Sequence, residues 1–170
     1  MATPVVSTPV SLTVTHPNAA GIDVGSRSHY VAVPADRDEQ PVREFGVYTP
    51  DLHTMADWLH ACHVTHVAME ATGVYWVQLF LVLQARGLQV IVFNPQQSKS
   101  NPGRGTDVAS CQWIQQLHTY GLLQPSFRPD EVTATLQGYW RLRARLVQQT
   151  AAPIWMKEEP VMKRGIKNAH

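Results

Sequence analysis

Three acidic residues lie where an isolated charge would be costly, and they constrain the fold more than any other feature of the chain. Asp23 closes one short apolar run, Glu70 directly follows another, and Asp107 opens an expected helix. A carboxylate at the end of a buried strand is unfavourable unless it is paired or bound to a cation. A fold that collects three such groups makes a site for a hard divalent ion, the usual device for cutting phosphodiester bonds.

Apolar runs and turn residues predict alternating strands and helices. The first three strands are joined by turn-rich segments, which favours an antiparallel meander. The last strand is almost wholly apolar, as expected in a sheet covered on both faces. The predicted strands are residues 20–24, 29–34, 42–48, 64–69 and 88–93, and the predicted helices begin at Pro50, Tyr75, Thr106 and Asp130.

Glycine, proline and capping residues organise the second half of the chain. Residues 96–105 are polar and interrupted by Gly and Pro, which predicts a mobile loop. Thr106 is a good helix cap, and the first turn is where the negative charge of Asp107 is favoured. That helix should end at Gly121. A linker then leads to a long helix over residues 130–152, which carries Arg141, Arg143 and Arg145.

The composition describes a globular chain whose charge is uneven. Apolar residues make up 44% and charged residues 16% of the sequence, and no apolar run is long enough to span a bilayer. The net charge of +1 hides a basic second half, because residues 97–170 hold 10 Lys/Arg and 5 Asp/Glu. This suits a phosphate backbone, although a solvated helical surface is the simpler explanation of the count. Cys62 and Cys111 lack metal-type spacing and fit a reducing cytoplasm.

The order of elements is typical of the ribonuclease H-like fold, in which three antiparallel strands precede parallel strands joined by helices. Its metal carboxylates come from the first strand, the fourth strand and a late helix, which are the places of Asp23, Glu70 and Asp107. With these motifs the chain resembles the amino-terminal DEDD domain of an IS110/IS1111-type transposase, which is similar to the resolvase RuvC. The matching segments are residues 21–24, 69–76, 92–95, 102–108, 112–114, 121–127 and 141–149.

The resemblance implies a fold class and a chemistry. The fold would be α/β, a ribonuclease H-like (RuvC-like) mixed sheet with flanking helices, followed by a long carboxy-terminal helix. Asp23, Glu70 and Asp107 would be catalytic and would bind Mg²⁺, or else Mn²⁺, during DNA recombination. The partners would be DNA, a structured guide RNA, and a second copy or a full-length transposase, in the cytoplasm and without a membrane. The expected parts are a flexible leader (1–19), the DEDD domain (20–128), a basic helix (129–152) and a divergent tail (153–170).

The chain departs from the family pattern in two ways. The family has Thr-Asp-x-x-Asp-Ala, and here Ser110 stands where the fourth carboxylate belongs. A serine hydroxyl is a poor substitute for a carboxylate on Mg²⁺. After the long helix, Pro153 and Pro160 prevent its continuation, and we expect the family's second domain to be missing. We therefore expect a truncated transposase that binds metal weakly and is inactive alone.

Two alternative functions follow from the same residues. The domain could be a non-catalytic nucleic-acid-binding remnant that modulates a full-length transposase. The phosphate contacts would come from Lys99, Arg104, Arg141, Arg143 and Arg145. An unrelated ribonuclease H-like protein, such as half of a sugar-kinase-like ATPase, ranks last because the second phosphate loop is missing.

Individual residues also have simpler interpretations. Asp23 and Glu70 could be strand-end turn formers, and Asp107 could be an ordinary first-turn acid. A zinc site is suggested by His60, Cys62, His63 and His66. The cluster crosses a helix–strand boundary and lacks a second ligand pair, which favours a solvated helix end. Tyr75 and its neighbour Trp76 should pack a helix onto the sheet, unless an aromatic ring beside the site stacks on a base.

Overall fold

The computed structural model describes residues 11–99, 105–126 and 129–151. The chain divides into two compact units, Met1–Arg128 and Pro129–His170. The first unit contains a five-stranded sheet with its helices, and the second contains the helix α4 (Pro129–Ala151). Among the described residues, no helix is both long enough and apolar enough to cross a membrane.

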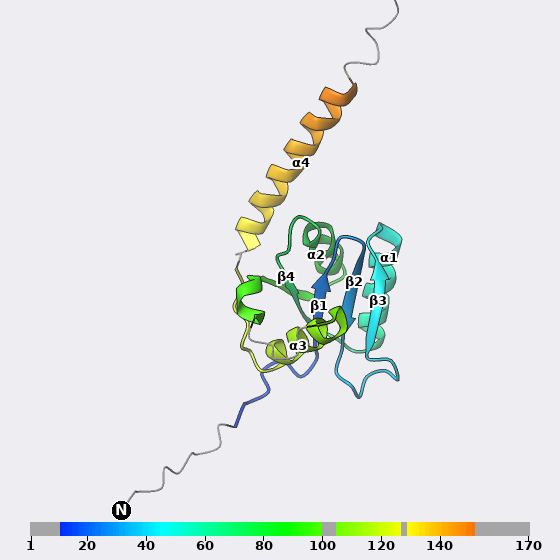
Figure 1. Cartoon of the computed structure of the whole chain (residues 1–170), viewed down its shortest axis with the longest axis vertical. Helices are drawn as coiled ribbons and strands as arrows, with labels where there is room; N and C mark the ends of the chain where they lie inside the picture. The colour runs from blue at the N-terminus through cyan, green and yellow to red at the C-terminus, as the bar shows by residue number, and fades with distance from the viewer. Residues whose placement is uncertain (1–10, 100–104, 127–128, 152–170) are drawn as a thin grey trace, which may run out of the picture. The chain divides into compact units, whose positions relative to one another are not determined.

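The sheet of the first unit is mixed and has the order β3-β2-β1-β4-β5 (Figure 1). The first three strands pair antiparallel, and β1, β4 and β5 run parallel to one another. The predicted meander and the ribonuclease H-like α/β fold are therefore confirmed. The strands are β1 (Ala19–Val24), β2 (Ser28–Ala32), β3 (Val42–Gly46), β4 (His66–Glu70) and β5 (Gln89–Phe93).

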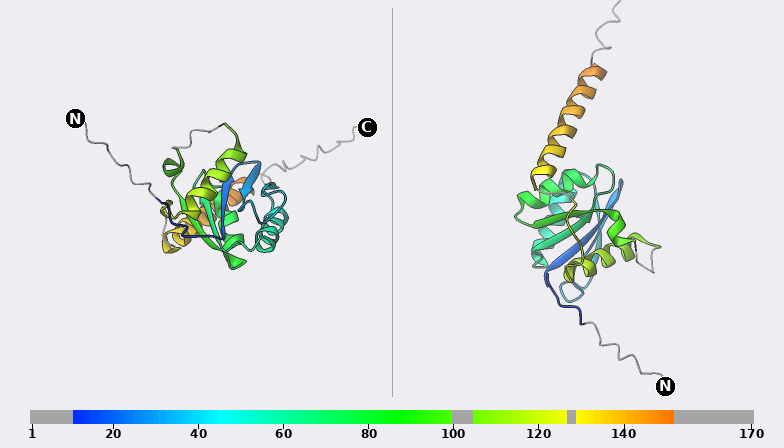
Figure 2. Two further views of the ribbon diagram at one scale, coloured as in Figure 1. Left: turned by 90° about the horizontal axis from the view of Figure 1, so that it is seen from below. Right: turned by 90° about the vertical axis from the view of Figure 1, so that its left-hand side faces the viewer.

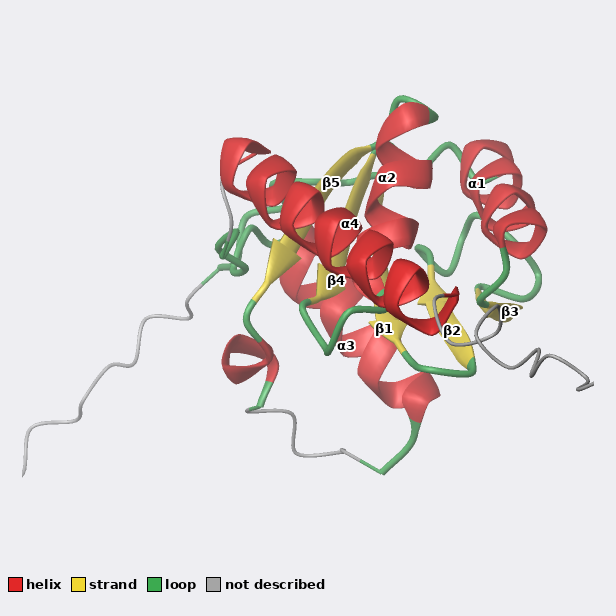
Figure 3. Cartoon of the chain, turned by 90° about the horizontal axis from the view of Figure 1, so that it is seen from above, coloured by secondary structure: helices red, strands yellow, loops and turns green. Residues whose placement is uncertain are grey.

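Helices cover both faces of this sheet. α1 (Thr49–Ala61) and α2 (Trp76–Ala85) lie on one face, and α3 (Asp107–Thr119) lies on the other (Figures 2 and 3). Two-sided burial explains why the inner strands β1 and β4 are almost continuously apolar rather than alternating. α3 ends as predicted at Gly121, whose positive φ of 69° closes the helix.

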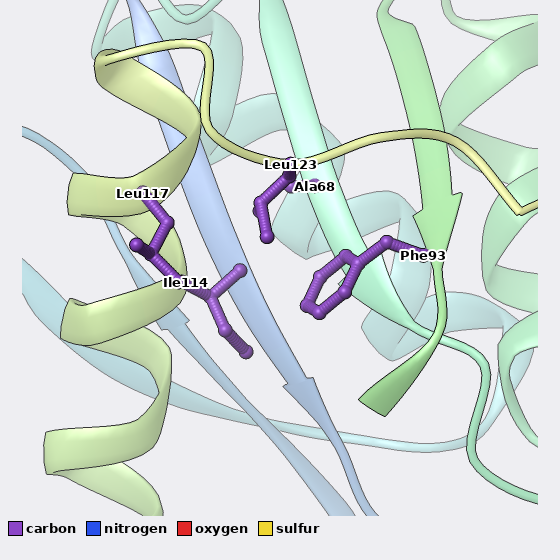
Figure 4. Close-up of a cluster of buried hydrophobic side chains, with 5 residues drawn as sticks. All are labelled: Ala68, Phe93, Ile114, Leu117 and Leu123. Atoms are coloured by element: carbon purple, nitrogen blue, oxygen red, sulfur yellow. The ribbon is translucent and has the colours of Figure 1, made fainter. Parts of the chain in front are cut away.

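A buried apolar cluster joins α3 to the sheet (Figure 4). Ala68 and Phe93 come from β4 and β5, Ile114 and Leu117 from α3, and Leu123 from the segment after α3. Phe93 and Ile114 are almost completely buried. This cluster fixes which face of β4 and β5 lies under α3.

Gly21 allows the closest contact between α3 and the sheet. A methyl group on this residue would lie 2.5 Å from the carbonyl oxygen of Cys111 and 2.8 Å from the Cα of Gln115, and closer still to the Gln115 amide nitrogen. These are backbone atoms, which cannot turn away as a side chain could. Glycine is therefore the residue that lets the helix backbone rest on β1.

The largest difference from the sequence prediction lies at the start of the segment 96–105, which was expected to form a loop and of which residues 100–104 lie outside the described residues. A short 3-10 helix, η1 (Pro95–Ser98), begins this segment. The Asn94 side chain accepts a hydrogen bond from the Gln96 amide at 2.9 Å, and the Gln97 amide donates to the Asn94 carbonyl at 2.9 Å. Polar composition indicated a loop, whereas local capping and a proline at the first position make an ordered turn.

The described part of the predicted leader is attached to α3. The backbone amides of Thr15 and His16 both donate to the Thr119 carbonyl, at 2.8 and 2.9 Å. The carbonyl of Asn18 accepts from the amide of Thr65, at 3.0 Å. The predicted tail over residues 153–170 lies outside the described residues.

Candidate functional site

β1 carries Asp23 to the carboxyl end of the central strand. Gly21, two residues earlier, faces α3, because a side chain there would run into the backbone of that helix. Side chains alternate along a strand, so Asp23 points to the same face. The pairing places Asp23 opposite Tyr30 of β2, and its side chain is partly buried.

β4 carries Glu70 to the same edge of the sheet. The two strands are parallel with Ile22 opposite Met69, so the next residues along them, Asp23 and Glu70, are neighbours. Ala68 packs under α3, and Glu70, two residues later, therefore points to that face. Two carboxylates thus leave adjacent parallel strands at one edge and on one face.

α3 runs antiparallel to β1 and so brings Asp107 toward this edge. The carbonyl of Cys111 lies against Gly21. One turn later, the Gln115 side-chain amide donates to the carbonyl of Ala19 at 3.4 Å. One turn of a helix is about 5 Å long and two residues of a strand are about 7 Å long. Moving one turn back along α3 therefore corresponds to moving about two residues forward along β1. The first turn of the helix, which begins at Asp107, therefore reaches the carboxyl end of β1.

Two shifted pKa values report the negative charge at this edge. Burial, and then the charge of Asp23, raises the pKa of the Cys111 thiol to about 12, with a smaller contribution from Asp107. The pKa of the Tyr30 phenol is also raised, first by its hydrogen bond to Glu44 and further by Asp107. The charge of Asp107 therefore contributes to the shift of a group on β2 and of a group on α3.

The start of α3 is stabilised by its own cap. The Thr106 hydroxyl accepts a hydrogen bond from the Ala109 amide at 3.1 Å, as the sequence predicted. Asp107 is exposed and lies in the first turn, where the partial positive charge of the helix end favours an anion. Among the described residues, however, no three His, Cys, Asp or Glu side chains lie close enough to hold a metal ion. The three acids share an edge and a face without forming a closed ligand cage.

The comparison with protein families decides what this domain is. A family model for transposases of the DEDD IS110 type matches residues 20–154. The chain belongs to the IS110 family of DEDD transposases. Membership implies interaction with DNA and a general dependence on divalent metal. No curated protein matches the chain.

Ser110, which the sequence places at the expected position of the fourth acid, lies near the start of α3. It lies one turn after Asp107 on α3, and its amide donates to the Thr106 carbonyl at 3.0 Å. Residues three apart on a helix lie on one face. Ser110, which is partly buried, therefore occupies the side of the helix that carries Asp107.

The basic residues predicted to contact nucleic acid do not all fall in one unit. Lys99 is exposed directly after η1 in the first unit, and Arg104 lies outside the described residues. The side chains of Arg141, Arg143 and Arg145 are exposed on α4 in the second unit. Lys99 and these three arginines are thus exposed at the surface.

The structure corrects the packing predicted for the first turn of α2. Trp76 is buried with 3% of its surface exposed, whereas Tyr75 is 48% exposed and does not pack onto the sheet. The exposed ring of Tyr75, five residues after Glu70, is free of the core. Helical periodicity could not separate the two residues, because α2 is apolar around most of its circumference.

Sequence reasoning missed two groups of residues. Ser98 is buried and donates a hydrogen bond to Glu70, although it lies in a segment predicted to be a loop. His16, His66 and His118 form a cluster, with ring centroids of His16 4.4 Å from His66 and 4.8 Å from His118. The three histidines are far apart in the sequence, so no spacing signal could have found them.

Proposed function

We propose that Asp23, Glu70 and Asp107 hold a divalent cation, Mg²⁺ or Mn²⁺, at the carboxyl edge of the sheet, where the transposase acts on DNA. The observation that carries this proposal is the arrival of three carboxylates from β1, β4 and α3 at one edge and on the face under α3. When bound, the cation would stabilise the charge that develops on the phosphate as a DNA strand is cut and rejoined.

The donor set fits a hard cation. All three groups supply carboxylate oxygens, which Mg²⁺ and Mn²⁺ prefer to nitrogen or sulfur. Asp23 and Glu70 come from the rigid inner strands of the sheet, so these two define the position of the site. Asp107 comes from the first turn of α3, so the third group is carried by a helix rather than by the sheet.

Replacing any of the three acids should abolish metal binding without unfolding the chain. Removing a residue that only hydrogen-bonds to a metal ligand typically weakens metal binding by roughly 10–100-fold. For Asp23→Asn, Glu70→Gln and Asp107→Asn, which remove a ligand charge, we expect the affinity for Mn²⁺ to fall by more than this. Electron paramagnetic resonance of free Mn²⁺ during a titration measures this affinity directly.

The matched control is Asp36→Asn, because the Asp36 side chain is 80% exposed and pairs only loosely with Arg37, at 3.6 Å. This variant should bind Mn²⁺ as the wild type does. Wild-type protein that binds no Mn²⁺, or site variants that bind it as tightly as Asp36→Asn, would refute the proposed cation site.

Ser110 should weaken the site, and restoring a carboxylate there should strengthen it. We expect Ser110→Asp to tighten Mn²⁺ binding by about 10-fold, since affinity follows the number of charged ligands. Asparagine has almost the same shape as aspartate but no charge, so Ser110→Asn should bind Mn²⁺ with the wild-type affinity. Equal affinities for the Asp and Asn variants would show that position 110 does not face the cation.

A second candidate function is nucleic-acid binding without catalysis, in which the domain modulates a complete transposase and engages DNA or the guide RNA. Two features support it: the residue at the position expected for the fourth acid is Ser110, and residues 97–170 hold 10 Lys/Arg against 5 Asp/Glu. The exposed arginines of α4 would contact phosphates rather than bases.

Filter binding of duplex DNA and of structured RNA over a series of salt concentrations tests this candidate. The affinity should fall steeply as salt rises, and replacing Arg141, Arg143 and Arg145 by glutamine should reduce the slope by up to about three counterions. Binding that does not respond to salt, or a slope that the triple variant leaves unchanged, would exclude this role for α4.

A further inference from the structure

Ser98 is buried against one of the proposed ligands. Only 2% of its surface is exposed, and its hydroxyl donates a hydrogen bond to Glu70 Oε1. The hydroxyl oxygen of Ser98 also lies 3.0 Å from the carbonyl oxygen of Pro95. A hydroxyl has one proton, and a carboxylate is the stronger acceptor, so the proton belongs to the bond with Glu70.

The turn that carries Ser98 is held from both sides. Asn94 caps η1 at its start. At its end the Gln97 side chain makes two hydrogen bonds to the backbone of Gln124, accepting from the amide at 2.8 Å and donating to the carbonyl at 3.0 Å. Ser98 therefore cannot follow Glu70 if that side chain rotates.

Glu70 is fixed at the backbone in a similar way. It is the last residue of β4 and pairs with Phe93 of β5. The next amide, that of Ala71, donates to the Phe93 carbonyl at 3.0 Å. With the backbone held by β5 and one carboxylate oxygen held by Ser98, the direction of the second oxygen is also set.

We propose that Ser98 is a positioning residue that orients the Glu70 carboxylate toward Asp23 for cation binding. This inference rests on the proposed function, because it concerns the same site. Ser98 itself touches neither the cation nor the DNA in this role. It acts only through Glu70, and a ligand held in advance binds its cation more tightly than one that must be ordered.

Titration of Mn²⁺ into the wild type, Ser98→Ala and Ser98→Thr tests the inference. Loss of the hydroxyl in Ser98→Ala should weaken Mn²⁺ binding by about 10–100-fold, whereas Ser98→Thr keeps the hydroxyl and should recover most of the affinity. Ser126→Ala, at an exposed serine, is the matched control and should bind as the wild type does. If the threonine variant does not fold, Ser98→Cys, with its weaker donor, should give an intermediate affinity.

A metal-free measurement separates positioning from a merely structural role. We expect the losses of stability in the metal-free Ser98→Ala and Glu70→Gln proteins not to add up in the double variant, because the two residues share one hydrogen bond. Thermal unfolding measures these losses. Wild-type affinity in Ser98→Ala would overturn this inference alone. An equal weakening in Ser98→Ala and Ser98→Thr would do the same, since it would show that packing and not the hydroxyl matters. Failure of the wild type to bind Mn²⁺ would overturn both this inference and the proposed function.

Discussion

Gly21→Ala is expected to destabilise the first unit by about 3 kcal/mol or more, because the added methyl group meets backbone atoms of α3 that have no room to move. Relief of the clash would require α3 to lift from β1. The same shift would carry Asp107 away from Asp23, so Mn²⁺ affinity should fall with stability. Urea unfolding followed by circular dichroism measures the loss.

Gly138→Ala is the control for this prediction. A methyl group there would meet nothing within 4 Å, and alanine is preferred to glycine inside a helix by about 0.5–1 kcal/mol. The control should therefore leave the stability of the first unit unchanged and strengthen α4. A Gly21→Ala protein as stable as the wild type would show that the helix does not rest on the strand at this point.

Acid is expected to weaken the fold through His118, beginning at a pH above the range in which carboxylates take up protons. Its ring is 2% exposed, and neither ring nitrogen has a hydrogen-bond partner among the described residues. Burial, and then the nearby charges of His16 and His66, lowers the pKa of His118 from 6.5 to about 4. The unfolded chain therefore takes up this proton more readily than the folded one.

The sign and size of the pH effect follow from that difference. The contribution of His118 is fully present above pH 6.5 and is lost as the pH falls toward about 4. The loss should reach about 3 kcal/mol at the end of this window. The lowered pKa of His66 acts in the same direction. Chemical unfolding at a series of pH values between neutrality and the lower pKa measures the slope.

His118→Phe should flatten the pH dependence, because it keeps a ring of similar shape without a titrating group. His53→Gln changes an exposed histidine and should keep the full acid sensitivity. A wild type whose stability is constant across the window, or a His118→Phe protein that remains as acid-sensitive, would contradict the assignment to this residue.

Local rules predicted the order of elements and several of their ends. Apolar runs located all five strands. The turn-rich segments between the first three indicated the antiparallel start, and the order of elements indicated the parallel remainder. Thr106 and Gly121 were identified as the boundaries of α3 from their chemistry alone, and the structure confirms both. These features depend on neighbours in sequence, which is why a single chain was enough to predict them.

Features that depend on distant segments were not predictable. Besides its local cap, η1 is held by hydrogen bonds between Gln97 and Gln124, which lies 27 residues away. The polar sequence of that segment does not indicate this contact. His118 had the appearance of an ordinary residue in the last turn of a helix. Its ring lies against His66 of β4 and against His16, whose segment folds back onto α3. The exposure of Tyr75 also could not be predicted from neighbouring residues in the sequence.

The three acids of the site were predicted from their motifs and from the order of elements. That they lie at the same edge of the sheet follows from the register of the strands. The register shows that Asp23 and Glu70 are neighbours, and the direction of α3 shows why Asp107 approaches them. Sequence spacing alone could not supply Ser98, because its role depends on a turn that packs against the end of β4.

The late position of α3 has a consequence for synthesis on the ribosome. The five strands and the two earlier helices are all made before Asp107 leaves the exit tunnel, yet Ala68 and Phe93 have no cover until Ile114 and Leu117 arrive. Until α3 is made, the nascent chain therefore exposes an apolar face of the sheet to solvent. Chaperones that recognise apolar surfaces would have their best opportunity to engage it during that interval.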